Sequence, residues 1–265
     1  MNLITLLTDF GTRDYFVGAM KGAVLSVNPE AAIVDITHHS PPHNIRAAAF
    51  TLFAAHSTFP KDTIHVCVVD PGVGSERRAI LAITDNYLFV APDNGVLSLI
   101  YAQEPNVRVF HITNDRFFRQ PVSTTFHGRD IFAPVAGALS RGVLPAELGE
   151  ETRDFVRFEV IKPRQLDEHT VQAEIVHIDH FGNCITNFRH EDLPTDFHAH
   201  NLTAEIGNQK ISKMQNFFAQ AVRDGELFMI FGSAGFLEIV VFQHSAAKLL
   251  KAEIGERVLL KRATG

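Results

Sequence analysis

The first half of the chain alternates short apolar runs with segments of helical length. The runs NLITLL, AAIVDI and IHVCVV are separated by residues 14–27 and 45–57, and Asn44 is placed to cap the second of these segments. Strands that alternate with helices pair in parallel, because each connection must cross the sheet and a helix fills that crossing. This half therefore predicts an α/β fold, a parallel sheet with crossover helices.

Two further runs, AILAIT and YLFVA, flank the turn Asp85-Asn86 and predict a hairpin added to that sheet. From about Phe155 the pattern changes to strand-like runs separated by turns, among them VQAEIVHID, LFMIFG and LEIVVF. This change predicts a separate, smaller all-β unit. Pro163 and the charges around it mark a connector, so we expect an N-terminal α/β domain over residues 1–163 and a C-terminal all-β domain over residues 164–265.

Charge and hydropathy exclude two classes of partner. The chain has 24 basic and 30 acidic residues and no basic stripe, so nucleic acid is not an expected partner. No apolar stretch reaches the roughly 20 residues that span a bilayer, and the N-terminus lacks a basic leader. The only cysteines, Cys67 and Cys184, imply no disulfide framework, and we expect both side chains to be buried and to pack in the core. These features predict a cytoplasmic protein without a membrane partner.

Four acidic residues fall where predicted strands give way to turns: Asp9, Asp35, Asp70 and Asp93. Ligands of α/β proteins bind at the carboxyl ends of the strands, since the loops converge there. The alternative for each residue is that its carboxylate only caps a turn or a following helix.

The turn in VVDPGVGSERR combines an acid, two glycines and two arginines. Its glycines let the backbone approach a ligand closely, and Asp70 and Arg77 can converge on one small volume. The alternative is a plain tight turn. The stretch lacks the Lys-Ser/Thr of a P-loop and the third glycine of a dinucleotide fingerprint, so it is not a strong phosphate site.

Histidines occur beside two of these turns. His38, His39 and His43 lie close to Asp35 in sequence, but no HExxH or HxH spacing accompanies them, and adjacent residues in extended backbone point to opposite sides. A shared zinc or iron is the alternative; we expect one histidine to face a pocket and another to face solvent. His127, in STTFHGRD, can orient or deprotonate a nucleophile, or its ring can cap the helix that follows, with Asp130 as the acid of the helix start.

Two turns of the second half contain residues that could bind a ligand. HIDHFGNCITN contains Asp179, Phe181 and Asn183, and FGSAGFLEIVV contains Ser233. An acid suits a cation, an aromatic ring suits stacking, and an amide suits the edge of a nucleobase. Taken alone, both are ordinary hairpin turns.

Seven motifs in this order run through nearly the whole chain: LLTDFGTRDYFVGAMKG, VDITHHSPP, VVDPGVGSERR, APDNGVLS, TFHGRDIFAPVA, HIDHFGNCITN and GSAGFLEIVV. Together they resemble the S-adenosyl-L-methionine (SAM) hydroxide adenosyltransferase family, which is related to the enzymes that fluorinate and chlorinate SAM. The resemblance implies an N-terminal α/β domain, a C-terminal β-barrel, and a homotrimer with active sites between one subunit's first domain and its neighbour's second.

The resemblance also implies residue roles. Asp70, Arg77 and His127 match the set that holds water or hydroxide for attack on the ribose C5′. The matches on the substrate side are Asp9 for the two ribose hydroxyls, Asp179 and Ser233 for the methionine amino and carboxylate groups, and Asn183, next to Phe181, for adenine. His43 stands where relatives carry Phe or Trp against the sugar, which is a departure from the family.

The implied activity is hydrolysis of SAM, a small-molecule substrate, to adenosine and L-methionine, without a metal or a further cofactor. A 5′-halogenase is disfavoured, because halogenases carry Tyr and Thr in the turn where this chain has Asp70 and Val73. A second alternative is a protein that binds adenosyl compounds without catalysis, in which the three residues form only a hydrogen-bonded turn. Product formation separates this alternative from an enzyme.

Overall fold

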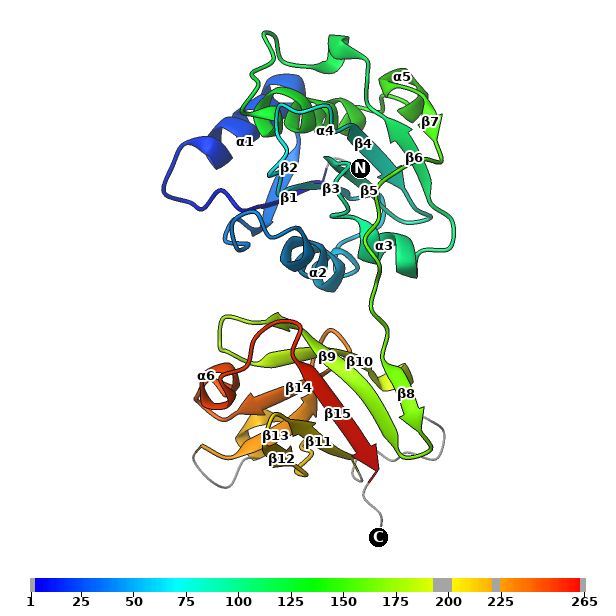
Figure 1. The fold of residues 1–265 in the computed structure, drawn as a ribbon. Coiled ribbons are helices and arrows are strands. Elements are labelled where there is room, and N and C mark those ends of the chain that lie inside the picture. Colours follow the sequence, from blue (N-terminus) through cyan, green and yellow to red (C-terminus); the bar gives the residue numbers. More distant parts are fainter. Residues whose placement is uncertain (1–2, 193–201, 221–224, 263–265) are drawn as a thin grey trace. The chain divides into compact units, whose positions relative to one another are not determined.

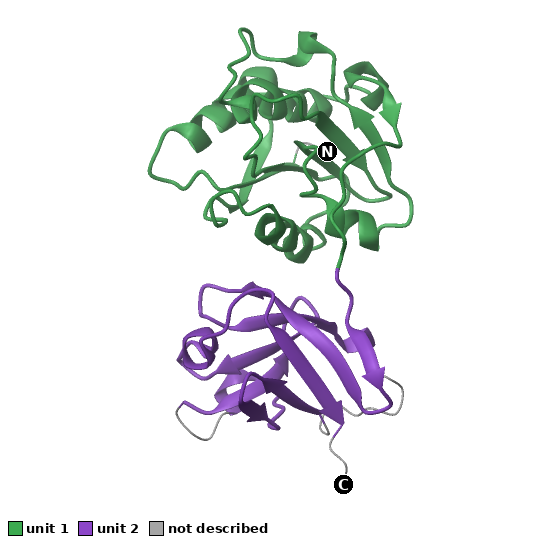
Figure 2. Ribbon diagram, viewed as in Figure 1, with its two compact units in different colours: residues 1–160 green, residues 161–265 purple. Residues whose placement is uncertain are grey.

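The computed structural model describes residues 3–192, 202–220 and 225–262. The chain divides into two compact units, residues 1–160 and 161–265 (Figure 2). Among the described residues, no helix has both the length and the apolar character needed to cross a membrane. Each unit has its own core and is described by itself.

The first unit is a seven-stranded sheet with helices on both faces (Figure 1). Four neighbouring strands run parallel, and the β4–β5 pair is antiparallel, which confirms the predicted hairpin. In spatial order the strands are β2 (Ala32–Thr37), β1 (Leu3–Thr8), β3 (Ile64–Val68), β5 (Leu88–Pro92), β4 (Ala79–Ile83), β6 (Arg108–His111) and β7 (Glu151–Thr152).

Helices cover the two faces because successive strand residues point to opposite sides. Leu6 faces α1 (Phe16–Val27) and α4 (Ala133–Ser140), whereas Leu7 faces α2 (Ile45–His56), on the side that also carries α3 (Ser98–Gln103). The capping prediction for α2 is confirmed, since the Asn44 side chain accepts the backbone N–H of Ala47 at 3.0 Å. Shorter elements complete the unit: the helix α5 (Pro145–Leu148), a π-helical turn (Gly128–Phe132) and a 3₁₀ turn (Asp115–Phe117).

The parallel strands carry acids at their common edge. Asp9 and Asp93 directly follow β1 and β5, and Asp70 lies two residues beyond β3. Asp35 differs from the prediction: it lies inside β2, two residues before the strand ends, because pairing with β1 continues to Thr37.

The second unit is an eight-stranded, barrel-like antiparallel sheet with an apolar interior. Its path runs β12, β11, β15, β9, β10, β14, β13, and the segment after β12 bonds to Met229 of β13, which brings the two ends of the path together. The strands are β8 (Arg164–Asp167), β9 (Thr170–Ile178), β10 (Cys184–Arg189), β11 (Leu202–Ile206), β12 (Gln209–Ile211), β13 (Leu227–Phe231), β14 (Phe236–Val241) and β15 (Arg257–Arg262), with a short helix α6 (Ala246–Leu250) and 3₁₀ turns at His190–Asp192 and Phe218–Gln220.

Candidate active site

The turn after β3 holds a buried ion pair. Arg77 Nε donates to both carboxylate oxygens of Asp70, at 3.0 and 2.9 Å, and a second guanidinium nitrogen also bonds Oδ2. Gly74 has φ +80°, and a Cβ there would overlap the carbonyl of Thr124. Only glycine therefore lets the backbone of this turn lie so close to Thr124. The side chains of Arg77 and Asp70 are 11% and 4% exposed, so their charges neutralise each other away from bulk water.

Arg77 also reaches across the unit to His127. Its Nη2 lies 2.9 Å from Nδ1 of His127. A guanidinium has no acceptor, so Nδ1 must accept and the neutral ring carries its proton on Nε2. Burial, and then the charge of Arg77, hold the pKa of His127 below its usual value. The structure thus brings Asp70, Arg77 and His127 into one hydrogen-bonded chain, and His127 makes no capping bond to the helix that follows.

Asp130, three residues after His127, is fully buried and is not a simple acid of the helix start. It accepts bonds from Arg129 at 2.7 and 2.8 Å, from the backbone of Ser123 at 2.9 Å and from Arg119 at 3.3 Å. These partners outweigh the effect of burial, which alone would raise its pKa, so the carboxyl pKa lies below its usual value. The network joins residues 119–130 and fixes the turn that carries His127.

Asp9 lies at the same sheet edge, one strand from Asp70. Its Oδ2 accepts the backbone N–H of His43 at 2.8 Å, and His43 has the unusual φ of +63°. The neighbouring Phe10 packs edge-on against Phe126, with ring centroids 5.9 Å apart. This contact connects the turn that carries Asp9 to the segment that carries His127.

Asp93 has a structural role. One of its oxygens accepts the Nε–H of Arg78 at 2.8 Å, and the other accepts the backbone N–H of Val156 at 2.8 Å. It therefore ties the last part of the first unit to the sheet edge, a role different from the turn or helix cap that was its alternative.

The three clustered histidines do not converge. His38 is buried and lies 2.8 Å from the Thr8 hydroxyl, whereas His39 is exposed and lies 3.3 Å from Thr12. In the described part of the chain, no group of three or more His, Cys, Asp or Glu side chains could hold a metal ion. One histidine thus points inward and its neighbour outward, as adjacent residues of extended backbone do.

Both cysteines are free and buried, as predicted. Burial raises the thiol pKa of both residues, and that of Cys184 reaches about 11. A thiol with such a pKa is not ionised at neutral pH, so neither cysteine is a nucleophile here.

In the second unit, the β9–β10 turn folds around Asp179. Its Oδ1 accepts the backbone N–H groups of Phe181 and Asn183 at 2.9 and 2.8 Å, and its Oδ2 accepts the Asn183 side chain at 2.8 Å. Gly182 has φ +83° and packs where a Cβ would overlap Ser245. Asn183 is 5% exposed, whereas the Phe181 ring is 74% exposed and free to stack on a ligand.

Ser233 lies exposed in the turn between β13 and β14, and Glu238 lies in β14, the strand that follows this turn. The Glu238 carboxylate packs directly on Gly232, where a Cβ would overlap it. Burial, together with the charge of Asp179, raises the pKa of Glu238 to about 7. The motif analysis missed Glu238, although a lone acid in the apolar run LEIVV was a signal for it.

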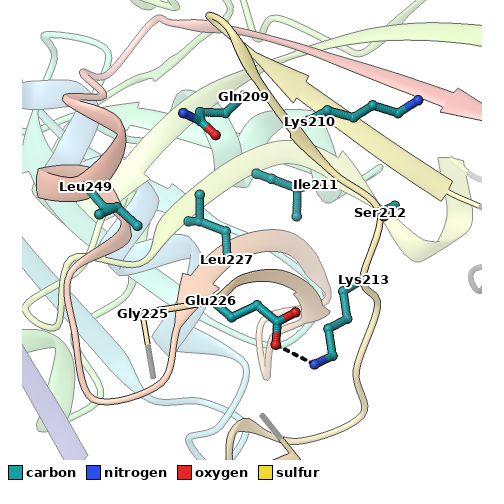
Figure 3. A pocket seen from close by; sticks show the side chains of 9 residues that line it. All are labelled: Gln209, Lys210, Ile211, Ser212, Lys213, Gly225, Glu226, Leu227 and Leu249. Atoms are coloured by element: carbon teal, nitrogen blue, oxygen red, sulfur yellow. Dashed lines mark hydrogen bonds and ion pairs between the residues drawn. The ribbon is translucent and has the colours of Figure 1, made fainter. Parts of the chain in front are cut away.

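A separate pocket of about 480 Å³ lies beside β12 and β13 (Figure 3). Its lining includes the ion pair of Lys213 with Glu226, at 2.6 Å, and the side chains of Lys210 and Leu249. No predicted site residue lines it.

Comparisons with known proteins agree with this division of the chain. Residues 4–149 match a model of the SAM hydroxide adenosyltransferase N-terminal domain, and residues 173–259 match one of the corresponding C-terminal domain. A protein of Methanocaldococcus jannaschii named (R)-S-adenosyl-L-methionine hydrolase is 34% identical, over 96% of this chain and 93% of the relative.

A solved structure of an uncharacterized conserved protein from Thermotoga maritima superposes with a TM-score of 0.91. It is 35% identical, over 98% of this chain and 100% of the other. A fluorinase of an Actinoplanes species is more distant, at 26% identity over 72% of this chain and 73% of the relative.

Proposed function

This chain belongs to the SAM hydroxide adenosyltransferase family, and we propose that its hydrolysis of SAM to adenosine and L-methionine takes place at Asp70, Arg77 and His127. The observation that carries the proposal is the hydrogen-bonded chain of these three residues at the carboxyl edge of the sheet. Such a chain of neutralised, oriented donors suits a small anionic nucleophile.

Hydroxide attacks the ribose C5′, the C5′–S bond breaks, and the sulfur leaves as a neutral thioether. The charges of hydroxide and sulfonium cancel as the bond forms, so a pocket that removes water from both reactants favours the reaction, and positioning contributes further. The leaving group needs no proton. When the nucleophile comes from water, one proton is released to solvent.

The role of His127 follows from its tautomer. Nδ1 accepts from Arg77, so Nε2 carries a hydrogen that can be donated to hydroxide. In this state His127 has no free lone pair and stabilises hydroxide as a donor. Asp70 holds the guanidinium in place and cancels its charge.

The substrate contacts form the second part of the proposal. Asp9 binds both ribose hydroxyls, Asp179 and Ser233 bind the methionine amino and carboxylate groups, Asn183 contacts adenine, and Phe181 and His43 contact the nucleoside. The contacts of Asp179 support this assignment, because within the described residues its carboxylate is bonded by neutral groups of its own turn and no cation pairs with it, which leaves it available to an ammonium group.

Several curated relatives are named for the (R) epimer of SAM. The sulfonium is a stereocentre, so the two epimers direct the methionine chain differently from a ribose held at the same place. We infer that this chain prefers the (R) epimer. Separate assays with the two epimers test the preference, and equal kcat/KM values would contradict it.

The family resemblance also supports a homotrimer in which each site uses one subunit's first domain and a neighbour's second. Mixing an inactive Asp70→Ala protein with an inactive Asp179→Ala protein should restore part of the activity through mixed trimers. Absence of recovery despite demonstrated subunit exchange would contradict this arrangement. A cytoplasmic location belongs to the same proposal and is supported by the two free thiols.

No metal or further cofactor belongs to the proposed reaction, because a displacement with a neutral leaving group needs no Lewis acid. Activity that is lost on chelation and regained with zinc or iron would contradict this.

Incubation with SAM in oxygen-18 water tests the reaction itself. Adenosine that carries one heavy oxygen at the 5′ position is expected. Unlabelled adenosine would contradict attack by water, and absence of product would favour the alternative of a protein that binds without catalysis.

A further inference from the structure

Two motifs of the sequence, TDFG and DITHHS, meet in a continuous polar chain. The hydroxyl of Thr8 lies 2.8 Å from Nδ1 of His38, and Nε2 of His38 lies 3.1 Å from Oδ1 of Asp35. Lys21 of α1 bonds the other oxygen of Asp35 at 2.6 Å. Thr8 and His38 are 0% and 3% exposed, so the inner part of the chain is buried.

Nε2 of His38 lies near the Asp35 carboxylate without a hydrogen bond to it, and the negative charge there favours the tautomer with the proton on Nε2. In that tautomer Nδ1 accepts from the Thr8 hydroxyl. The same hydroxyl oxygen accepts the backbone N–H of Phe10 at 3.2 Å. Burial alone would raise the pKa of Asp35, but the bond from Lys21 and the contact with His38 outweigh it and lower the pKa, which keeps the carboxylate ionised.

The row of polar contacts ends beside Asp9. Thr8 and Phe10 flank Asp9 and are joined by the bond to the Thr8 hydroxyl. The same histidine loop also binds the turn through its backbone, since Gly11 donates to the His38 carbonyl at 2.7 Å and His43 donates to the Asp9 carboxylate at 2.8 Å. Two side chains of the loop also reach the turn: the buried His38 contacts Thr8, next to Asp9, and the exposed His39 lies 3.3 Å from Thr12.

We propose that His38 is a positioning residue, which holds the Thr8–Phe10 turn through the Thr8 hydroxyl and so aims the Asp9 carboxylate at the ribose hydroxyls. This inference rests on the ribose role proposed above for Asp9. It assigns His38 a function within the sugar site without contact to the substrate, and it separates His38 from the exposed His39, which has no such role.

Two amide substitutions test the contact of His38 with Thr8 and its contact with Asp35 separately. In His38→Asn the amide oxygen lies near the former Nδ1 and can still accept from Thr8, whereas in His38→Gln the amide reaches Asp35 and leaves Thr8 without its acceptor. Thr8→Val removes the hydroxyl with little change in volume and acts as a second, independent variant. His39→Asn is the matched control on the exposed neighbour.

Calorimetric affinities for adenosine and for 2′,3′-dideoxyadenosine provide the readout. We expect His38→Gln and Thr8→Val to weaken adenosine binding about 10-fold, as for loss of one well-oriented hydrogen bond to a charged group. The dideoxy compound lacks the hydroxyls that Asp9 binds, so its affinity should change by less than about 3-fold, as should kcat at saturating SAM. His38→Asn and His39→Asn should resemble the wild type.

Two results would overturn the inference. Equal losses for both nucleosides would indicate a general structural role, and unchanged adenosine affinity in both His38→Gln and Thr8→Val would remove the positioning role. The Asp9→Asn variant separates the ribose assignment of Asp9 from the positioning role of His38. If it leaves adenosine affinity unchanged, the ribose assignment fails, whereas if it weakens binding while the His38 and Thr8 variants do not, only the positioning role of His38 fails.

Discussion

The Asp70 turn and the Asp179 turn use the same residue type at the end of a strand and give it opposite electrostatic properties. Asp70 is paired with the guanidinium of Arg77, so its charge is cancelled, and we propose that its role is to orient. Asp179 is bonded by backbone N–H groups and by the amide of Asn183, so its charge is solvated but not cancelled.

Burial, and then the charge of Asp179, raise the pKa of Glu238. The partners of a strand-end aspartate therefore determine its properties: the charge of Asp70 is cancelled by Arg77, Asp179 is bonded by neutral groups, and Asp93 is held in structural bonds.

Loss of Arg77 should have the largest effect on activity. Arg77→Ala removes the link between Asp70 and His127, and we expect kcat to fall about 10²–10³-fold while the affinity for SAM stays nearly unchanged. Single-turnover kinetics with a separate binding measurement checks this. Arg116→Ala, which removes an exposed arginine paired with Glu147, is the control. If Arg77→Ala weakened only the affinity for SAM, the proposed role of the Asp70 turn in catalysis would be contradicted.

Asp179→Asn tests the other turn. It removes the uncancelled charge but keeps a side chain of the same shape, so we expect KM for SAM to rise about 10-fold or more, with a much smaller change in kcat. Affinity for adenosine, which lacks the ammonium group, should be nearly unchanged. An equal loss of adenosine affinity would mean that Asp179 only shapes the turn.

The two units should also respond to pH in opposite directions. In the first unit, His65 is fully buried, bonds Thr5 at 2.7 Å and stacks on Phe89 at 5.1 Å. Burial, and then the charge of His56, lower its pKa from 6.5 to about 3. Between these values the unfolded chain binds the proton and the folded chain does not, so the free energy of unfolding should fall by about 1.4 kcal/mol for each pH unit below 6.5.

Denaturant unfolding between pH 7 and pH 5, followed by signals from the first unit, measures this slope. His65→Asn keeps an acceptor for Thr5 and should be less stable overall but also less sensitive to pH. His169→Asn, at an exposed histidine of the second unit, should retain the wild-type slope. Identical slopes in all three proteins would show that His65 does not control acid stability.

Glu238 should have the smallest effect, with the opposite sign. Its pKa is about 7 in the folded protein against 4.5 as the usual value, so the folded state binds more protons between pH 4.5 and pH 7. Its contribution to stability is present at low pH and is lost as the pH rises through 7. Glu238→Gln should therefore raise the Tm of the second unit at pH 8, by about 2 °C, and change it less at pH 5. A lower Tm at pH 8 would contradict this.

The sequence by itself determined the elements that depend on local pattern. Alternating apolar runs and helical segments specify the parallel strands, Asn44 specifies the start of α2, and the turn at Asp85-Asn86 specifies a hairpin. Parallel strands end at one edge, so the sequence also indicated that Asp9 and Asp70 would share an edge.

The sequence already indicated that Asp70 and Arg77 can meet, but tertiary structure decided the other partners of these side chains. Arg77 and Arg78 are adjacent, yet Arg77 pairs with Asp70 and reaches His127, whereas Arg78 pairs with Asp93. The side chains of His38 and His39 likewise point in different directions, that of His38 toward Thr8 and that of His39 toward solvent. Neighbouring residues of extended backbone point in opposite directions, and which direction leads to a partner depends on residues up to fifty positions away. Local pattern contains no information about such distant contacts, because only packing of the whole sheet brings them together.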